Sequence, residues 1–594
     1  MENLIQRLTL AIDAEYDAKN QEAKDLLTLP IETRVLKGNS ITKVTARSFN
    51  LIGQENSSTI SFNKVIVTCI NNSSKFREGN PVMLSGYGRN FKFEIIEDHG
   101  DEMILEETYN QYSIPTNLNG ASNWQIDEAS VDIRRIVKNS TAILTSDPNK
   151  LRYLSGILNG SILPLFSSAR TQKAFKIAEA TDLNQSQQEA FIKAYSTENY
   201  FLIQGPPGSG KTWLLAHLAI EFAKEGNKVL VTASTHTAIN NALQKTSTLS
   251  HSPDIIKVGN KIQSDGLYYN GSNAKNIPDF RRSGYGDTSS GIIVGATCYA
   301  PHTRKLDFMN WDVIIIDEAG QLSIPLAMAA MVKGKKFIFI GDHKQLPPIL
   351  SYNQDDIVFS KSIFEHLFQF APGLMLNTTY RMNKEINRFP SRQFYEGKIL
   401  PEANNADWIL DIPNNFDRHQ AILDSTKPEV LFCHHHQSHY SRCEFEAEMI
   451  AEFVEEFIKK GINPDEIAII TPFRAQIRQI KKSLSGLKIY DQIKDKLFVD
   501  TIERIQGQER DIVIYSLATS DPIKAEQRTD FFFNPNRFNV ALTRAKKKRI
   551  VIGNKSLFEY VSKDDQVNLL IQNFKDFYKD SSVVEENTET EDLF

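Results

Sequence analysis

The hydrophobic positions in the N-terminal region follow two different periods. A first helix is indicated by apolar residues that recur every four positions, Leu4, Leu8 and Ile12. From about residue 41 to 126, short apolar runs alternate with polar residues between Gly and Asn turns, as in Phe91 to Ile95. Helical spacing returns between Ser130 and Leu165. The pattern predicts a small β-barrel at about 41–126, carried on a helical stalk, within an N-terminal region of 1–180. Such a barrel is either a nucleic-acid-binding module or a structural insertion.

After residue 180 the pattern changes to short apolar, β-branched runs separated by helical segments. The first set comprises 228–231, 292–294, 313–316 and 337–340, and the second comprises 430–432, 467–470, 511–515 and 550–552. Such runs are typical of strands buried on both faces of a parallel sheet. We therefore expect an α/β fold with two domains in tandem, 181–376 and 377–575. Residues 261–291 read as a surface insertion and 576–594 as an acidic disordered tail.

A glycine-rich loop between an apolar run and a helical segment opens the first α/β domain. It consists of Gly205, Pro206, Pro207, Gly208, Ser209, Gly210, Lys211 and Thr212. This is the G-x-x-x-x-G-K-[ST] pattern in a strand–loop–helix context, in which backbone N–H groups surround phosphates. Lys211 can reach the terminal phosphates, and the Thr212 hydroxyl can ligate Mg²⁺. The loop predicts a site for a nucleoside triphosphate.

Two acidic residues follow the apolar run 313–316. Asp317 and Glu318 are therefore expected at the carboxyl end of a central strand, the edge at which ligands bind in open α/β sheets. Asp317 is placed to hold Mg²⁺, and Glu318 to orient or deprotonate the attacking water. The next strand ends in a polar cluster in which Gln345 is the candidate γ-phosphate sensor.

The second domain supplies arginines that suit phosphoryl transfer. Arg381 and Arg544 are the candidates, because an arginine from a second domain stabilises the charge that spreads in the transition state. Arg544 precedes a run of basic residues, so a solvated basic face is the alternative. The interpretation requires Arg544 to lie near Lys211.

Charge and cysteine content exclude little. The 594 residues carry a formal net charge of −5, so any basic groove for nucleic acid must be local. Four scattered cysteines do not form a disulfide framework, which favours a reducing, cytoplasmic environment. No apolar run is long enough to cross a membrane, so we expect no membrane association.

The motifs together resemble those of superfamily 1 helicases. In chain order they are QGPPGSGKT (204–212), DEAGQ (317–321), GDHKQLPP (341–348), TYRMN (379–383), VDTIERIQGQERD (499–511) and NVALTRAKK (539–547). The chain is most similar to the branch that contains the nonsense-mediated-decay helicase and the immunoglobulin mu-binding helicase, over about 183–554. The resemblance implies two RecA-like domains, ATP with Mg²⁺ as the fuel, and 5′ to 3′ movement on single strands.

The resemblance also implies further roles. Gln187 matches the glutamine that reads the adenine edge, Tyr380 the aromatic residue that stacks on the base, and Glu509 the acid near the ribose. The segments that hold the phosphates of the strand match Ser234, Thr235, His236, Thr471, Pro472, Arg474 and Thr501. Contacts of this kind grip a backbone without reading sequence.

Two functions remain open, a helicase or translocase and an ATP-gated clamp that binds strands without travelling. The sequence does not distinguish a DNA track from an RNA track, and the oligomeric state, pathway and host are not readable from it. The His/Cys-rich segment from Cys433 to Cys443 suggests a metal site, but its spacing matches no finger pattern and plain structural histidines are favoured. The C-terminal Asp592-Leu593-Phe594 resembles a short docking peptide for a protein partner, with a solubilising tail as the alternative.

Overall fold

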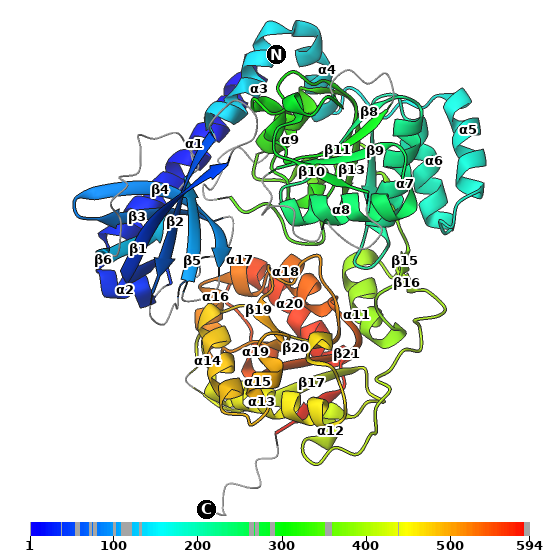
Figure 1. The fold of residues 1–594 in the computed structure, drawn as a ribbon. Helices are drawn as coiled ribbons and strands as arrows, with labels where there is room; N and C mark the ends of the chain where they lie inside the picture. The colour runs from blue at the N-terminus through cyan, green and yellow to red at the C-terminus, as the bar shows by residue number, and fades with distance from the viewer. Residues whose placement is uncertain are drawn as a thin grey trace, which may run out of the picture.

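The computed structural model describes residues 2–586 except 37, 54–59, 70–73, 75, 77–79, 99–101, 108–120, 130–133, 260–266, 268–272, 286–290, 351–358 and 438. A helical stalk with a barrel stands beside two α/β domains (Figure 1). None of the described helices combines the length and the apolar character needed to cross a bilayer. No disulfide joins the four cysteines, all of which lie among the described residues and are buried.

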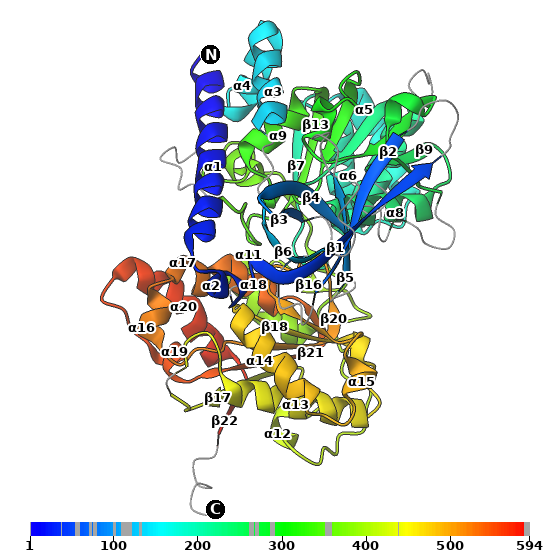
Figure 2. The same cartoon turned by 60° about the vertical axis from the view of Figure 1, so that its left-hand side comes forward.

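The stalk is built from helices that are distant in the sequence. Its elements are α1 (Glu2–Thr28), α2 (Ile31–Leu36), α3 (Arg134–Ser146) and α4 (Pro148–Leu158). Helix α1 runs alongside α3 (Figure 2), where Leu8 and Leu144 share one apolar core and Lys138 Nζ lies 2.6 Å from Asp13 Oδ1. Helix α3 in turn packs on α9 (Ile324–Met331) of the first α/β domain. These contacts fix the stalk to that domain.

A closed six-stranded antiparallel barrel follows α2, as predicted, in the strand order β1-β2-β5-β4-β3-β6. The strands are β1 (Ser40–Gly53), β2 (Ile60–Thr68), β3 (Pro81–Gly86), β4 (Arg89–Asp98), β5 (Glu102–Glu107) and β6 (Ala121–Glu128). Gly86 is required where it lies, because an added Cβ would be 2.5 Å from the Trp124 ring. Arg34 of α2 forms an ion pair with the buried Asp127 of β6, which attaches the barrel to the stalk.

The first α/β domain contains an eight-stranded sheet in the order β10-β9-β11-β8-β12-β13-β7-β14, in which every pair is parallel. Its strands are β7 (Tyr200–Gln204), β8 (Lys228–Thr232), β9 (Asp254–Val258), β10 (Lys275–Ile277), β11 (Ile292–Gly295), β12 (Trp311–Ile316), β13 (Gly334–Gly341) and β14 (Leu374–Met375). One face is covered by α5 (Ser168–Glu179), α6 (Gln185–Ser196), α7 (Lys211–Lys224) and α8 (His236–Leu249). The other face is covered by α4, α9 and α10 (Ile363–Phe368).

The second α/β domain contains a six-stranded parallel sheet in the order β19-β18-β20-β21-β17-β22. Its strands are β17 (Glu429–His434), β18 (Ile467–Thr471), β19 (Phe498–Thr501), β20 (Arg510–Ser516), β21 (Ala545–Asn554) and β22 (Val583–Glu585), and a separate pair joins β15 (Thr378–Thr379) to β16 (Leu400–Pro401). Its helices are α11 (Lys384–Tyr395), α12 (Gln420–Leu423), α13 (Glu444–Lys459), α14 (Arg474–Ser485), α15 (Tyr490–Ile493), α16 (Pro522–Glu526), α17 (Thr529–Phe532), α18 (Pro535–Leu542), α19 (Ser556–Glu559) and α20 (Asp565–Asp580). Short 3₁₀ turns lie at Phe280–Arg282, Ala300–His302 and Ala319–Gln321 in the first domain and at Pro464–Glu466 in the second. The predicted strand runs all lie in strands of the two sheets.

The structure corrects one expectation about irregular segments and adds detail to another. The disordered tail was expected from residue 576, but α20 continues to Asp580 with Phe577 buried, and β22 pairs with β17. Val583 and Val584 reach the two apolar cores of the second sheet, which outweighs the acidic composition of this segment. The expected surface insertion at 261–291 supplies β10 at the sheet edge and the buried Phe280. The docking tip, Asp592 to Phe594, lies outside the described residues.

Candidate nucleotide-binding site

The glycine-rich loop connects the carboxyl end of β7 to α7. Gly210 caps α7 in the left-handed conformation (φ 76°) and no side chain bonds the first amides of the helix. An added Cβ at Gly205 would be 2.0 Å from Lys211 Cγ, and one at Gly208 would be 2.5 Å from Arg381 Cβ. The loop therefore has space only for glycine at positions 205 and 208, and the uncapped start of α7 fits the phosphates of a nucleotide.

A cavity of about 490 Å³ lies above this cradle, between the two α/β domains. Its lining residues are Asp182, Gln187, Pro206, Pro207, Gly208, Ser209, Gly210, Lys211, Thr212, Trp213, Lys245, Glu318, Gln345, Tyr380, Arg381, Gly507, Glu509 and Arg544. Lys211 and Arg544 thus line the same space, which is the condition that the sequence interpretation required.

The acidic pair after β12 lies at this edge of the sheet. Glu318 takes a left-handed backbone conformation (φ 49°, ψ 38°), which is costly for a residue with a side chain and places its Oε1 3.8 Å from Lys211 Nζ. Asp317 is buried, and burial together with the Glu318 charge raises its pKa to about 7. Among the described residues no Lys or Arg nitrogen lies within ion-pair distance of Asp317. A buried carboxylate of this kind, with the Thr212 hydroxyl in the cavity, offers the hard oxygen ligands that Mg²⁺ prefers.

Gln345 and the two arginines meet across the domain boundary. Gln345 Oε1 accepts a hydrogen bond from Arg544 Nη2 at 3.2 Å. Arg544 is 2% exposed, and burial, followed by the neighbouring Arg381, lowers its pKa to about 9. Arg381 donates to Glu509 Oε2 at 2.6 Å and to the Thr543 carbonyl at 3.0 Å. Three residues that are distant in the sequence therefore line one cavity.

The residues assigned to the base and ribose also line the cavity. Gln187 forms a capping box with Asn184 and donates to the Ser209 carbonyl at 3.0 Å, so its amide also supports the loop. Tyr380 is 42% exposed, and its hydroxyl accepts a hydrogen bond from Asn184 Nδ2 at 2.7 Å. Although burial alone would raise it, the pKa of Glu509 is held below its usual value by Arg381 and Lys546.

Sequence reasoning missed four residues of the cavity wall, Asp182, Trp213, Lys245 and Gly507. Trp213 Nε1 donates to Asp182 Oδ1 at 3.0 Å, and Lys245 Nζ lies 4.2 Å from the centroid of the indole ring. Trp213 directly follows Thr212 in the sequence, so its place beside the loop could have been predicted. Lys245 comes from α8 and gave no such signal.

The residues assigned to strand phosphates lie at the carboxyl ends of strands in both sheets. Ser234 and Thr235 are exposed after β8, and Thr235 caps α8 by accepting a hydrogen bond from the Ala238 amide. His236 Nδ1 lies 2.9 Å from Lys257 Nζ, and burial, followed by Lys257, lowers the pKa of His236 to about 4. In the second sheet Arg474 is exposed at the start of α14, whereas Thr471, Pro472 and Thr501 are buried.

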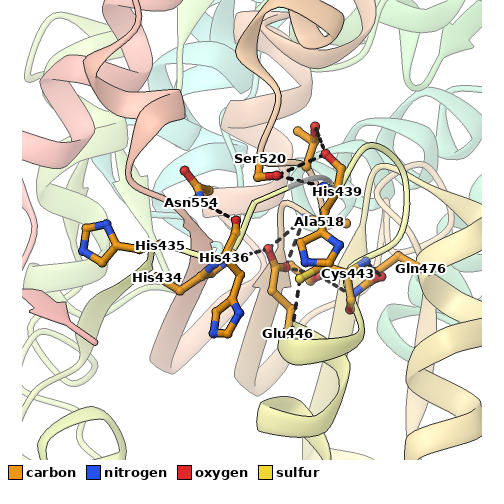
Figure 3. Close-up of polar contacts among 12 residues, drawn as sticks. His434, His435, His436, His439, Cys443, Glu446, Gln476, Ala518, Ser520 and Asn554 are labelled. Carbon is orange, nitrogen blue, oxygen red and sulfur yellow. Dashed lines mark hydrogen bonds and ion pairs between the residues drawn. The ribbon is translucent and has the colours of Figure 1, made fainter. Parts of the chain in front are cut away.

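The His/Cys-rich segment forms a buried hydrogen-bonded cluster at the start of α13 (Figure 3). Cys443 caps α13, and its Sγ accepts from the Glu446 amide at 3.5 Å. The fully buried Glu446 carboxylate accepts hydrogen bonds from Ser516 Oγ, from the Ala518 amide and, at 3.0 Å, from His434 Nε2. The ligand atoms of His434, Cys443 and Glu446 lie within 4.8 Å of one another; the hydrogen bonds use the Glu446 carboxylate, Cys443 Sγ and His434 Nε2, and His434 Nδ1 is buried without a hydrogen-bond partner. The remaining members do not join the cluster: Cys433 packs in the apolar core, and His436 pairs with Glu586.

Fold and cavity define a protein with two parallel-sheet domains that form one P-loop nucleotide site. Two family models, each described as an AAA domain, match residues 182–400 and 359–556. The DNA replication ATP-dependent helicase/nuclease DNA2 of Saccharomyces cerevisiae is 28% identical over 444 residues, which cover 68% of this chain and 28% of that protein. The regulator of nonsense transcripts 1 homolog of Neurospora crassa is 26% identical over 535 residues, 82% of this chain and 48% of that protein.

The chain thus spans less than half the length of these relatives. A solved structure, the Arterivirus nonstructural protein 10 (helicase), matches 91% of this chain and 82% of its own at 14% identity, but its TM-score of 0.38 is too low to carry an argument. The family matches and the ordered motifs agree. Together they support the assignment of this chain to the superfamily 1 helicases, which are ATP-hydrolysing enzymes.

Proposed function

We propose that this chain is an ATP-driven motor that moves on single-stranded nucleic acid, in the 5′ to 3′ direction, and separates strands or displaces bound proteins. One observation carries the proposal. Lys211 and Gln345 of the first domain line the same cavity as Arg381 and Arg544 of the second, with Gln345 and Arg544 in direct contact. A nucleotide in this cavity would touch both domains, so its hydrolysis would change how they are held together.

In this proposal each residue that the sequence assigned to the site has one task. Lys211 and the loop amides hold the phosphates, and Thr212 with Asp317 would hold Mg²⁺, which supplies charge neutralisation when bound. Glu318 accepts the proton of the water that attacks the γ-phosphorus while the bond to the β-phosphate oxygen breaks. Gln345 contacts the γ-phosphate, and Arg381 and Arg544 stabilise the charge of the transition state. Gln187, Tyr380 and Glu509 hold the adenine and ribose.

The nucleic-acid strand is held through its phosphate backbone by residues from both sheets. Ser234, Thr235 and His236 on one side, and Arg474 with its neighbours on the other, would grip the strand phosphates alternately as the cavity opens and closes. The printed names of the relatives refer to DNA replication and to nonsense transcripts, so DNA and RNA are both candidate tracks. The four buried cysteines, which form no disulfide, support an intracellular, reducing environment.

The test is the ATPase rate of the full chain with single-stranded DNA, with single-stranded RNA and with neither, followed by unwinding of duplexes with 5′ or 3′ tails. We expect stimulation by at least one strand type and unwinding of the 5′-tailed duplex. Lys211→Ala should abolish hydrolysis. Lys335→Ala is the matched control, because Lys335 is an exposed lysine at the amino end of β13, the edge of the sheet opposite the loop. Stimulated hydrolysis without unwinding or displacement of a bound protein would favour the ATP-gated clamp, and an inactive wild-type chain would overturn the proposal.

A further inference from the structure

Asp342, the first residue after β13, holds the side chain of Gln345. It is 2% exposed, and its Oδ2 accepts a hydrogen bond from Gln345 Nε2 at 2.8 Å. Its Oδ1 accepts from Gln204 Nε2 at 3.2 Å and from the Lys344 amide at 3.1 Å. The orientation of Gln345 in the cavity therefore depends on where this carboxylate is held.

The second domain reaches this carboxylate through one hydroxyl. Tyr395, the last residue of α11, donates from its hydroxyl to Asp342 Oδ2 at 2.6 Å. Burial and the Asp342 charge raise the pKa of Tyr395 well above its ordinary value, so the phenol remains a donor at neutral pH. The Tyr395 hydroxyl oxygen also accepts a hydrogen bond from Asn539 Nδ2 of α18 at 2.8 Å. Tyr395 thus joins the loop after β13 to α18.

Arg544 follows α18, two residues after the helix ends at Leu542. Asn539 Nδ2 donates to the Lys344 carbonyl at 2.7 Å, and Asn536 Nδ2 donates to the Gln345 carbonyl at 2.6 Å. Arg544 Nε donates back to the Val540 carbonyl of α18 at 3.0 Å, and Nη2 reaches Gln345. Hydrogen bonds therefore form a closed ring: α18, Tyr395, Asp342, Gln345, Arg544 and back to α18. In Figure 1, α11 and α18 lie on the side of the second domain that faces the first.

We propose that Tyr395 is a positioning residue that sets Gln345 and Arg544 together, so that the sensor and the arginine are aligned only when α18 is docked on the loop after β13. The inference deepens the proposed function and rests on it. Tyr395 does not line the cavity, so its effect would pass through Asp342 and Asn539. The ring would allow a strand bound to the second domain to change the turnover rate without touching the nucleotide.

The test is Tyr395→Phe, which removes only the hydroxyl. We expect kcat for strand-stimulated ATP hydrolysis to fall roughly 10- to 100-fold, because small misplacements at a reacting centre have effects of this size. The KM for ATP should change less than about threefold, since the cradle is untouched. Tyr200→Phe is the matched control, because Tyr200 is equally buried and its hydroxyl donates to the Ile162 carbonyl at 3.1 Å, away from the ring.

A second measurement does not need turnover. In the nucleotide-free chain, amide hydrogen exchange at 342–346 and 535–542 should accelerate in Tyr395→Phe and not in Tyr200→Phe. Asn539→Ala should accelerate exchange in the same segments at least as much, because it removes both the bond to Tyr395 and the direct bond to the Lys344 carbonyl. Wild-type kcat and exchange in Tyr395→Phe would overturn the inference, as would equal effects in the Tyr200→Phe control. An inactive wild-type chain would instead overturn the proposed function, and the exchange measurement would still decide the role of the ring.

Discussion

The two α/β domains share a strand–loop–helix unit but use it in opposite ways. In the first sheet β7 lies next to β13 and leads through the glycine loop to α7, and in the second sheet β17 lies next to β21 and leads through residues 435–443 to α13. The start of α7 has no side-chain cap. The start of α13 is capped by Cys443, and the Glu446 carboxylate is buried there under three hydrogen-bond donors.

The difference explains why the first unit opens into the cavity of about 490 Å³. A helix N-terminus attracts an anion. The N-terminus of α7 opens into the cavity, whereas the N-terminus of α13 is capped by the Cys443 thiol, and the Glu446 carboxylate in its first turn is buried. The second domain contributes to the site from other elements, with Arg381 before α11 and Arg544 after α18. The first unit therefore lines the cavity proposed for the nucleotide, and its counterpart is a structural joint that holds α13 against the end of β20.

The largest effect should come from the arginine that the second domain supplies. Arg544→Ala is expected to lower kcat by about 10³-fold or more, the range seen for arginines delivered to phosphoryl transfer. Nucleotide binding should persist, because the cradle belongs to the first domain. Steady-state ATPase rates and titration with a fluorescent ATP analogue measure the two quantities. A variant that loses binding and turnover equally would show that Arg544 acts in the ground state instead, and a melting curve controls for its buried position.

A smaller loss is expected within the first domain. Glu318→Gln keeps the shape of the side chain but cannot accept a proton, so turnover should fall by about 10²-fold or more while ATP binding is retained. The change also removes the charge that faces Lys211 at 3.8 Å, so binding is expected to hold or to tighten. The measurement is a single-turnover rate beside a nucleotide titration. Robust hydrolysis by this variant would remove Glu318 from the role of base.

The sequence predicted the β7–loop–α7 unit well and the β17–loop–α13 unit poorly, for a physical reason. The residues of the loop from Gly205 to Thr212 are adjacent in the chain, so their pattern is local and readable. Ser516 and Ala518, two of the donors to Glu446, are distant from it in the sequence. Tyr395 and Asp342, which form a hydrogen bond, are 53 positions apart. Contacts between such distant residues depend on how sheets and helices pack, which periodicity does not specify. The strand β22 was missed because acidic residues in its surroundings obscured a two-valine run that two cores bury.

The smallest effect on catalysis is expected from Glu446→Gln. This variant is also the sharpest test of the β17–loop–α13 unit. The amide cannot match a carboxylate that accepts from Ser516, Ala518 and His434, so the second domain should lose roughly 1.5–3 kcal/mol, the contribution of hydrogen bonds to a charged group. The measurement is a denaturant-unfolding curve that follows the second domain, with the ATPase rate per folded molecule staying near that of the wild type. Glu444→Gln is the control, because Glu444 begins the same helix with a side chain that is 62% exposed. Elemental analysis of the purified chain would show whether Glu446→Gln instead releases a bound metal ion. In that case the cluster would be a metal site, and the contrast between the α7 unit and the α13 unit would fail.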